Sequence, residues 1–445
     1  MKFLLLIAAF QLVLISILAE ELYRGNQLLR ISIEEEDDAR WMKSLEETSS
    51  GTTLDFWTSP VPGRKTDIMV TRGYVDEFKS ILRQRELSFD VIMVDVQENV
   101  NNERSQTTAA RRAKRDLGTL ALQDFDYSIY HTFEEIQQWT RDIAEEYSSF
   151  VNLFTFGYTF EGREILALEI TAPPAEGASD PKPIVYFEGG IHCREWISPA
   201  TVMFFTSQFL KNYVDNVDNA TRTLGMYDFH IVPLLNCDGY VYTWEVERLW
   251  RKSRQENPDF GCVGTDMNRN FDAFWGGGEG ASPWPCSIIY RGFVPLNHNE
   301  TRAIDDHFQN LRAANRVTKV FIDWHSYSQL ILAPWSYSAD VDPPKDTDKQ
   351  IAAAGAMAKA MNETHNVPEG YIHGVGTDIL YVSAGTSKDY GYASTPGATY
   401  SYTVELRDTG EYGFLLPADQ IIPTGEESYN GVVAMMDWIT ANDYD

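Results

Sequence analysis

The strongest constraint on the fold comes from two apolar, strand-like segments that each lead into a histidine. Residues 184–187 run into two glycines and then into His192, with Glu195 three residues further on. Residues 320–324 run directly into His325. Imidazole and carboxylate groups are good zinc ligands, and a catalytic zinc keeps three protein ligands and one open position. The pattern predicts a metal site at the ends of two buried strands, although His-x-x-Glu alone also arises by chance around a structural histidine.

From about residue 125 onward, helical and strand patterns alternate. Residues 161–163 form a tight turn between adjacent strands, so part of the sheet is antiparallel, whereas intervening helices imply parallel neighbours. We therefore predict an α/β domain with a mixed eight-stranded sheet and helices on both faces. The expected helices cover residues 132–147, 198–214, 299–315, 346–364 and 426–441, and the expected strands cover 151–158, 163–171, 184–188, 228–235, 319–325, 329–335, 378–382 and 400–406.

Residues 22–98 have a separate pattern of expected strands and helices. The length of 445 residues also favours two domains. Strands alternate with two helices, of which residues 74–85 have Val75, Phe78, Ile81 and Leu82 on one face. The order is β-α-β-β-α-β, which is typical of an α+β ferredoxin-like unit. The expected elements are strand 28–33, helix 34–47, strands 52–57 and 66–71, helix 74–85 and strand 88–96.

The first nineteen residues predict a signal peptide. Lys2 precedes an apolar run over residues 3–19 that ends in Ala19 before acidic residues. A membrane anchor is the alternative, but the run is short and no basic stop-transfer cluster follows it. Three acceptor sequences for N-glycosylation agree with secretion, at Asn219, Asn299 and Asn362. The net charge of −28 argues against a nucleic-acid partner, which requires a basic surface.

Residues 99–115 are polar, lack hydrophobic periodicity and end in a basic cluster, Arg111-Arg112-Ala113-Lys114-Arg115. Such clusters are usually only solvated segments. Between two folded units of a secreted chain, an exposed linker of this kind suits a trypsin-like or convertase protease. We therefore expect a pro-domain at residues 20–98, an activation linker at 99–115 cleaved after Arg115, and a mature domain at 116–445.

The four cysteines predict disulfides in an oxidising compartment. Cys262 and Cys286 bracket a Gly/Trp/Pro-rich loop, which a bridge would pin. Cys193 and Cys237 would then pair with each other by default, or Cys193 would remain a buried free thiol.

A further strand over residues 400–406 carries Glu405. Because side chains alternate across a strand, Ser401, Thr403 and Glu405 share one face. A carboxylate among apolar neighbours is costly unless it is paired or functional. The alternative is an exposed strand face.

Five stretches in this order make the chain resemble the secreted zinc carboxypeptidases of the pancreatic A/B type, a resemblance that covers nearly the whole sequence. The resemblance implies a zinc carboxypeptidase fold preceded by a pro-domain that blocks the substrate channel, with one Zn²⁺ per chain. The stretches are His192-Cys193-Arg194-Glu195-Trp196-Ile197, Arg248-Leu249-Trp250-Arg251-Lys252, Asp266-Met267-Asn268-Arg269-Asn270, His325-Ser326-Tyr327-Ser328-Gln329 and Glu405-Leu406-Arg407-Asp408-Thr409-Gly410.

The same resemblance implies a role for each matched residue. His192, Glu195 and His325 would ligate zinc, with Glu405 as general base and Arg251 stabilising the oxyanion. The residues implied in substrate binding are Asn268 and Arg269 at the terminal carboxylate, Tyr381 as a closing tyrosine, Arg194 in the next subsite outward, and Ser326 and Tyr327.

In this family the residue at the base of the terminal side-chain pocket sets the preference, and that position falls on Lys388. Thr403 and Ser383 would line the walls, and Thr386 stands where glycine is common. A buried ammonium demands an anion, so we predict release of acidic residues, favouring Glu, as in an insect digestive glutamate-specific type. If an insertion lies before Lys388, the lysine would instead reach solvent or pair with Asp389. The alternative is then an A-type enzyme for neutral residues; a basic preference ranks lowest.

The expected partners are peptides with a free C-terminus, an activating protease and proteinaceous carboxypeptidase inhibitors, with no nucleic acid and no membrane. The expected setting is extracellular, in a digestive lumen. One rival is a non-catalytic secreted binding protein on the same fold, which would typically lack the base or a ligand. A metal aminopeptidase, the second rival, has no use for Asn268 and Arg269.

Overall fold

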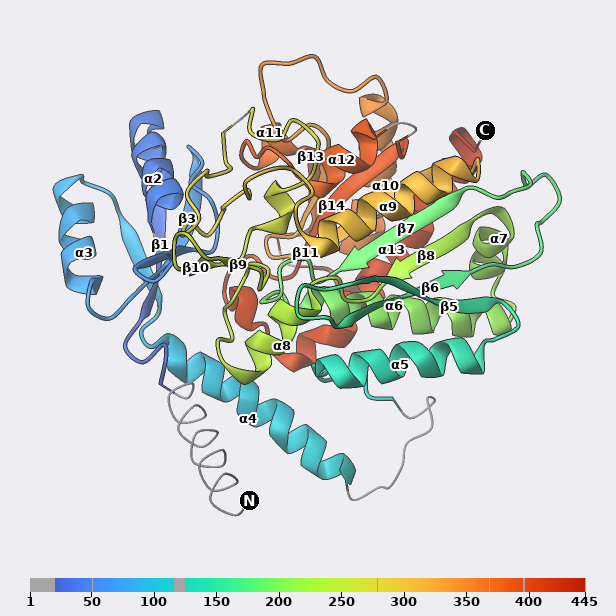
Figure 1. The fold of residues 1–445 in the computed structure, drawn as a ribbon, viewed down its shortest axis with the longest axis horizontal. Helices are drawn as coiled ribbons and strands as arrows, with labels where there is room; N and C mark the ends of the chain where they lie inside the picture. The colour runs from blue at the N-terminus through green and yellow to red at the C-terminus, as the bar shows by residue number, and fades with distance from the viewer. Residues whose placement is uncertain are drawn as a thin grey trace.

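A computed structural model describes residues 21–49, 51–115, 125–277, 279–367, 369–394 and 397–444. The expected signal peptide at residues 1–19 and the expected first mature residue, Asp116, lie outside the described residues. A small N-terminal domain lies beside a large α/β domain, and helix α4 extends from the first along the second (Figure 1). Among the helices of the described residues, none combines the length and apolar character needed to cross a bilayer.

The N-terminal domain has the predicted β-α-β-β-α-β order. Its elements are β1 (Gln27–Ile33), α2 (Glu36–Thr48), β2 (Leu54–Phe56), β3 (Arg64–Val70), α3 (Val75–Gln84) and β4 (Phe89–Met93). The four strands form an antiparallel sheet in the order β2-β3-β1-β4. The predicted apolar face of α3 is buried at Val75, Phe78 and Leu82, because these side chains pack with Leu29, Ile31 and Ile68 of the sheet.

Residues 99–115, expected as a linker without hydrophobic periodicity, instead belong to a single helix, α4 (Val96–Arg115). The expectation was wrong because it relied on apolar periodicity. The positions that α4 buries include Val96, Gln97, Val100, Glu103 and Thr107, and three of these five are polar. Polar partners satisfy them, as where Gln97 Oε1 accepts a hydrogen bond from the Tyr23 N–H (2.9 Å).

The large domain contains the predicted eight-stranded mixed sheet, in the order β13-β12-β14-β11-β7-β8-β6-β5. Its strands are β5 (Val151–Tyr158), β6 (Glu164–Ile170), β7 (Ile184–Gly189), β8 (Asp228–Val232), β11 (Thr318–Ser326), β12 (Leu330–Ala333), β13 (Ile372–Val375) and β14 (Tyr400–Leu406). The central strands β14, β11, β7 and β8 are parallel, whereas β5 and β6 are antiparallel, as the turn at 161–163 predicted. This places the carboxyl ends of β7, β11 and β14 side by side.

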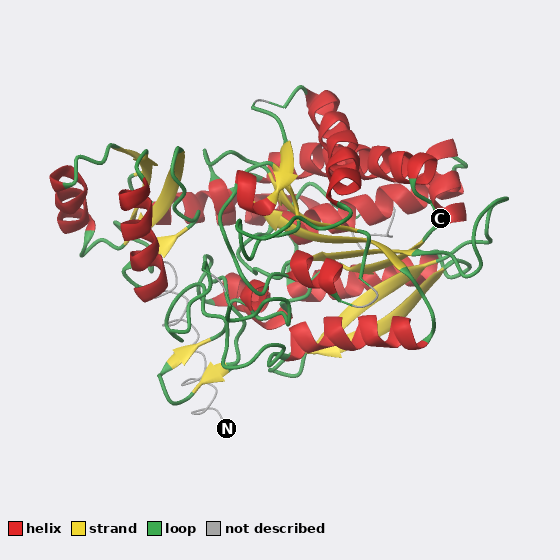
Figure 2. Ribbon diagram, turned by 90° about the horizontal axis from the view of Figure 1, so that it is seen from above, coloured by secondary structure: helices red, strands yellow, loops and turns green. Residues whose placement is uncertain are grey.

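Helices cover both faces of this sheet (Figure 2). They are α5 (Phe133–Glu146), α6 (Ile197–Val214), α7 (Asp218–Met226), α8 (Cys237–Glu245), α9 (Asn299–Ala313), α10 (Thr347–His365), α11 (Gly376–Ile379), α12 (Ser387–Ala393) and α13 (Ile421–Asn442). Short elements complete the domain: the hairpin β9 (Glu256–Asn257) and β10 (Cys262–Val263), and the 3₁₀ turns η2 (Met267–Arg269), η3 (Gly413–Leu415) and η4 (Ala418–Gln420).

Two predictions for this domain need correction. The strand expected at 378–382 is absent: the edge strand β13 ends at Val375 and the chain turns into α11. The default pairing of Cys193 with Cys237 is also wrong, since both are buried free thiols. Cys193 Sγ lies 3.0 Å from the Trp250 carbonyl oxygen and Cys237 Sγ lies 3.4 Å from that of Leu234. The predicted Cys262–Cys286 disulfide is confirmed.

Candidate metal centre and active site

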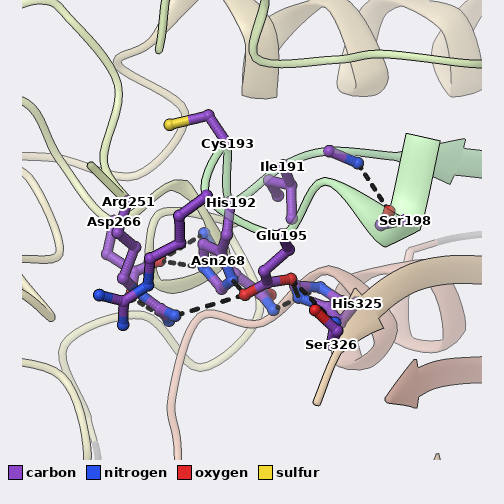
Figure 3. A network of polar contacts seen from close by, with 12 residues as sticks. Ile191, His192, Cys193, Glu195, Ser198, Arg251, Asp266, Asn268, His325 and Ser326 are labelled. Carbon is purple, nitrogen blue, oxygen red and sulfur yellow. Dashed lines mark hydrogen bonds and ion pairs between the residues drawn. The ribbon is translucent and has the colours of Figure 1, made fainter. Parts of the chain in front are cut away.

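Three side chains from two strand ends meet at one point. His192 and Glu195 follow β7, and His325 lies near the end of β11. Each offers one ligand atom, and the three atoms lie within 4.8 Å of one another, all buried. The Glu195 carboxylate lies between both imidazoles: its Oε1 lies 2.9 Å from His192 Nδ1 and its Oε2 lies 3.0 Å from His325 Nδ1 (Figure 3). The donor set of two imidazoles and one carboxylate suits zinc, and the three residues therefore fit such an ion.

Each imidazole is also held on its far side by a second carboxylate. His192 Nε2 lies 2.9 Å from Asp266 Oδ1, and His325 Nε2 lies 2.7 Å from Asp323 Oδ2. Burial opposes ionisation of Glu195, but the two imidazoles hold its pKa well below the ordinary value. The ligand carboxylate is thus available as an anion, as metal binding requires.

Glu405 lies beside this cluster because of strand register. In the parallel pair of β11 and β14, His325 is paired with Glu405, and both side chains line the same cavity. Burial raises the pKa of Glu405 to about 8. A divalent cation among the neighbouring ligands would favour the ionised form and lower that pKa.

Arg251 reaches the same cavity from the loop after α8. Its Nε and Nη2 donate to Asp266 Oδ2 at 3.1 and 2.9 Å, and its Nη1 lies 3.7 Å from Glu195 Oε1. Burial disfavours its charge, yet Asp266 and Glu195 raise the pKa of Arg251 above the ordinary value. The guanidinium is therefore a fixed positive charge at the edge of the cavity.

Asn268 and Arg269 form a second polar group on the turn η2. The Asp266 carboxylate caps this turn by accepting from the Asn268 N–H (3.0 Å). Asn268 Nδ2 lies 3.2 Å from His325 Nε2, and Arg269 Nη2 donates to the Tyr381 hydroxyl at 3.2 Å. Ser326 and Tyr327 line the same cavity. The structure thus brings together most of the residues singled out in the sequence.

Lys388, Thr403 and Arg194 lie outside the lining of this cavity. Lys388 sits in the first turn of α12, fully enclosed at 2% exposure, so it does not reach solvent. Its ammonium hydrogen-bonds to the Ser336 hydroxyl and lies 3.6 Å from Asp389 Oδ1. Burial lowers the pKa of Lys388, and Asp389 opposes that shift.

Arg194 is occupied by the N-terminal domain. Its Nη1 donates to both carboxylate oxygens of Asp55 at 2.9 Å. Two further residues of the N-terminal domain, Trp57 and Thr58, line the cavity directly, and the Tyr327 hydroxyl donates to Asp67 (2.8 Å). The family resemblance implied that the pro-domain blocks the substrate channel, but the sequence does not reveal which residues of the two domains meet.

Asp266 and Asp323 were also missed as functional residues. For Asp323 a signal existed: it is a charged residue within the apolar run 320–324, the same reasoning that singled out Glu405. Asp266 lies in a loop, where a carboxylate carries no comparable signal.

Two family descriptions match the chain: "Zinc carboxypeptidase" over residues 136–431 and "Carboxypeptidase activation peptide" over residues 29–103. Carboxypeptidase A1 of Mus musculus is 35% identical over 432 residues, covering 97% of this chain and 98% of the relative. Carboxypeptidase B of Homo sapiens is 33% identical over 429 residues, covering 95% of each. The crystal structure of thrombin activatable fibrinolysis inhibitor matches with a TM-score of 0.80 and 31% identity, over 94% of this chain and 100% of that one.

The matches extend over both domains, and the zinc-carboxypeptidase match spans both histidines, Glu195 and Glu405. The A-type and B-type relatives are almost equally similar to this chain, so the similarity does not determine which C-terminal residue the enzyme releases. The chain belongs to the zinc carboxypeptidase family and is a carboxypeptidase zymogen, with an activation peptide ahead of its catalytic domain.

Proposed function

We propose that this zymogen is secreted, is activated by cleavage near Arg115, and then releases single acidic residues, favouring Glu, from peptide C-termini. His192, Glu195 and His325 would hold the zinc. When bound there, zinc supplies a Lewis acid that lowers the pKa of water and polarises a carbonyl group. The observation that carries the proposal is the convergence of these three buried side chains beside Glu405.

The protein's own residues supply the remaining chemistry. Glu405, once ionised, accepts the proton of the attacking water and passes it to the leaving amine. The Arg251 guanidinium, fixed by Asp266, donates hydrogen bonds toward the oxygen on which negative charge develops. Asn268 and Arg269 bind the terminal carboxylate, which limits cleavage to the last peptide bond.

The acidic preference rests on Lys388. Its ammonium is enclosed between Ser336 and Asp389, on the helix that follows the wall residue Ser383. Thr403 is paired in register with Asp323 on β11, and helix α12, which carries Lys388, contacts both β11 and β14. An enclosed cation favours an anionic side chain and repels Lys and Arg. Asp389 competes for that cation, which is the argument for the alternative, an A-type enzyme that releases neutral residues.

Three otherwise identical peptides ending in Glu, Phe and Arg separate these options with trypsin-processed protein. We expect the highest kcat/KM for the Glu peptide. Lys388→Asp should invert the order toward the Arg peptide, whereas Lys359→Asp, on exposed α10 surface, should leave it unchanged. Faster release of Phe than of Glu by the wild-type enzyme would establish the A-type alternative.

Secretion and activation are supported by the sequence and by the contacts of the N-terminal domain. Asp55, Asp67 and Glu103 pair with Arg194, Tyr327 and Arg248 of the catalytic domain, so the intact chain has its outer substrate surface covered. We expect the intact chain to hydrolyse peptides much more slowly than the processed form, and peptides and proteinaceous inhibitors to share the uncovered cleft. Equal activity before and after processing would contradict this part of the proposal.

A further inference from the structure

The His325 imidazole is held from both sides, and the outer contact comes from a carboxylate with no role in the proposed chemistry. Asp323 lies two residues before His325 on β11, so both side chains point to the same face of the sheet. Asp323 Oδ2 lies 2.7 Å from His325 Nε2, while Nδ1 of the same ring lies 3.0 Å from Glu195.

The position of Asp323 is energetically unfavourable for a residue that only fills space. Its side chain is fully buried, between the apolar residues Ile322 and Trp324 along the strand. Its second oxygen, Oδ1, has no hydrogen-bond partner among the described residues. In the neighbouring strand β7, Glu188 is paired in register with it and is equally buried. An ionised carboxylate in such surroundings costs several kcal/mol unless it is paired.

Asp323 also connects the imidazole to the substrate-binding side of the site. The Ser387 hydroxyl donates to Asp323 Oδ2, and the Ser387 backbone N–H donates to Asn268 Oδ1 at 2.8 Å. Asn268 Nδ2 in turn lies 3.2 Å from His325 Nε2. A single carboxylate thus fixes His325 relative to helix α12 and to the residues proposed for the terminal carboxylate.

We propose that Asp323 is a positioning residue for the metal: it accepts the Nε2 proton of His325 and so leaves the Nδ1 lone pair directed at the ion. Asp266 has the same relation to His192. Outer carboxylates of this kind fix the tautomer and ring orientation of a ligand, and their loss typically costs about 10- to 100-fold in metal affinity. The inference rests on the proposed binding of zinc by His325, but not on the choice of C-terminal residue.

Zinc affinity of the full-length chain, measured by competition with a chromogenic chelator, tests this inference. Asp323→Asn should weaken zinc binding about 10- to 100-fold, because a neutral amide oxygen accepts the Nε2 proton more weakly than a carboxylate and carries no negative charge. The visible absorption spectrum of the Co²⁺-loaded protein should also change, which a purely structural role would not produce. Asp323→Ser, which is smaller, should give the same result if the Asn variant folds poorly.

Glu188→Gln is the matched control. Glu188 is as deeply buried and lies opposite Asp323 in register, but its hydrogen bond comes from the Tyr186 hydroxyl (2.9 Å). Its substitution should leave zinc affinity and the Co²⁺ spectrum unchanged. The inference is overturned if Asp323→Asn and Asp323→Ser bind zinc like the wild type, or if Glu188→Gln weakens binding equally.

His325→Ala distinguishes failure of this inference from failure of the proposed function. It should abolish zinc binding in the range measured. Wild-type affinity in that variant would refute the ligand set itself.

Discussion

Glu405 illustrates how much one side chain depends on its position in the sheet. It is paired in register with His325, and burial raises its pKa to about 8, so the metal-free site holds it mainly protonated at neutral pH. A bound cation favours the ionised form that a general base requires. Glu405→Gln should therefore lower kcat by about 10²- to 10⁴-fold. Zinc content should remain at wild-type level, measured by atomic absorption, and substantial hydrolysis by this variant would contradict the assigned role.

Gly376 determines whether Lys388 can occupy its present place. A Cβ at Gly376 would lie 2.5 Å from Ser336 Oγ and 3.2 Å from Lys388 Nζ, so alanine would force the Ser336 hydroxyl to move and would crowd the ammonium bound to it. We expect Gly376→Ala to lower the Glu-to-Phe ratio of kcat/KM about tenfold, if Lys388 sets the preference. Gly374→Ala is the control, because the three atoms nearest to a Cβ there all belong to the Ile379 side chain. An unchanged Glu-to-Phe ratio of kcat/KM in Gly376→Ala would show that Lys388 does not set the C-terminal preference.

At the scale of secondary-structure elements, helix α4 connects the two domains through a buried ion pair. The Glu103 carboxylate accepts from Arg248 Nε and Nη2 at 2.6 and 2.8 Å, and both side chains are buried. Arg248 also donates to the carbonyl oxygens of Arg194 and Phe414, each at 2.8 Å. Helix α4 is therefore bound to the catalytic domain at Glu103, which precedes the basic cluster at the C-terminal end of the helix.

Removal of one partner of this pair should loosen the activation peptide. Glu103→Ala leaves a buried guanidinium without its anion, which typically costs about 3–5 kcal/mol. We expect faster tryptic cleavage of the intact chain and higher activity before cleavage. Glu98→Ala, on the exposed side of the same helix, provides the comparison. Identical cleavage rates for the two variants would show that the pair does not hold the peptide in place.

The same helix shows where sequence reasoning fails. The central strands and long helices could be predicted because apolar residues occupy their buried positions, as in β11 and α6. Helix α4 buries Gln97 and Glu103, whose partners Tyr23 and Arg248 lie elsewhere in the chain, so its amphipathic pattern is invisible in the sequence. The same holds for the site. His192 and His325 stand out after apolar strands, whereas the contact of Lys388 with Ser336 depends on a loop that no local pattern specifies.

For the whole molecule, the buried His298 and the partly buried His307 should contribute to the response to acid. Burial lowers the pKa of His298 and of His307 to about 3, from an ordinary value near 6.5. Well above pH 6.5 both are neutral in the folded and the unfolded state. Between pH 6.5 and 3 the unfolded chain binds protons that the folded chain does not, so stability falls as the pH falls.

Each of these histidines should contribute about 1.4 kcal/mol per pH unit to the slope of unfolding free energy within that window. His298→Gln removes one titrating group and should make the slope shallower than in the wild type. Denaturant unfolding at a series of pH values measures the difference between the two proteins. If unfolding free energy changed with the same slope in the wild type and in His298→Gln from pH 6 to 4, His298 would take up its proton in the folded state as readily as in the unfolded one.

Removal of the metal should affect activity far more than architecture. Contacts within the protein fix the cluster, because Glu195 lies against both imidazoles and accepts from the Ser326 N–H (3.1 Å), while Asp266 and Asp323 hold the outer ring nitrogens. Dialysis of the processed protein against a chelator should abolish peptide hydrolysis yet preserve the circular dichroism spectrum. The thermal midpoint should fall, since a ligand present at about 1,000 times its Kd stabilises the folded state by about 4 kcal/mol. Added Zn²⁺ should restore both quantities in the wild type and neither in His192→Ala. Hydrolysis that persists in protein shown to be free of metal would remove the basis for assigning catalysis to these strand ends.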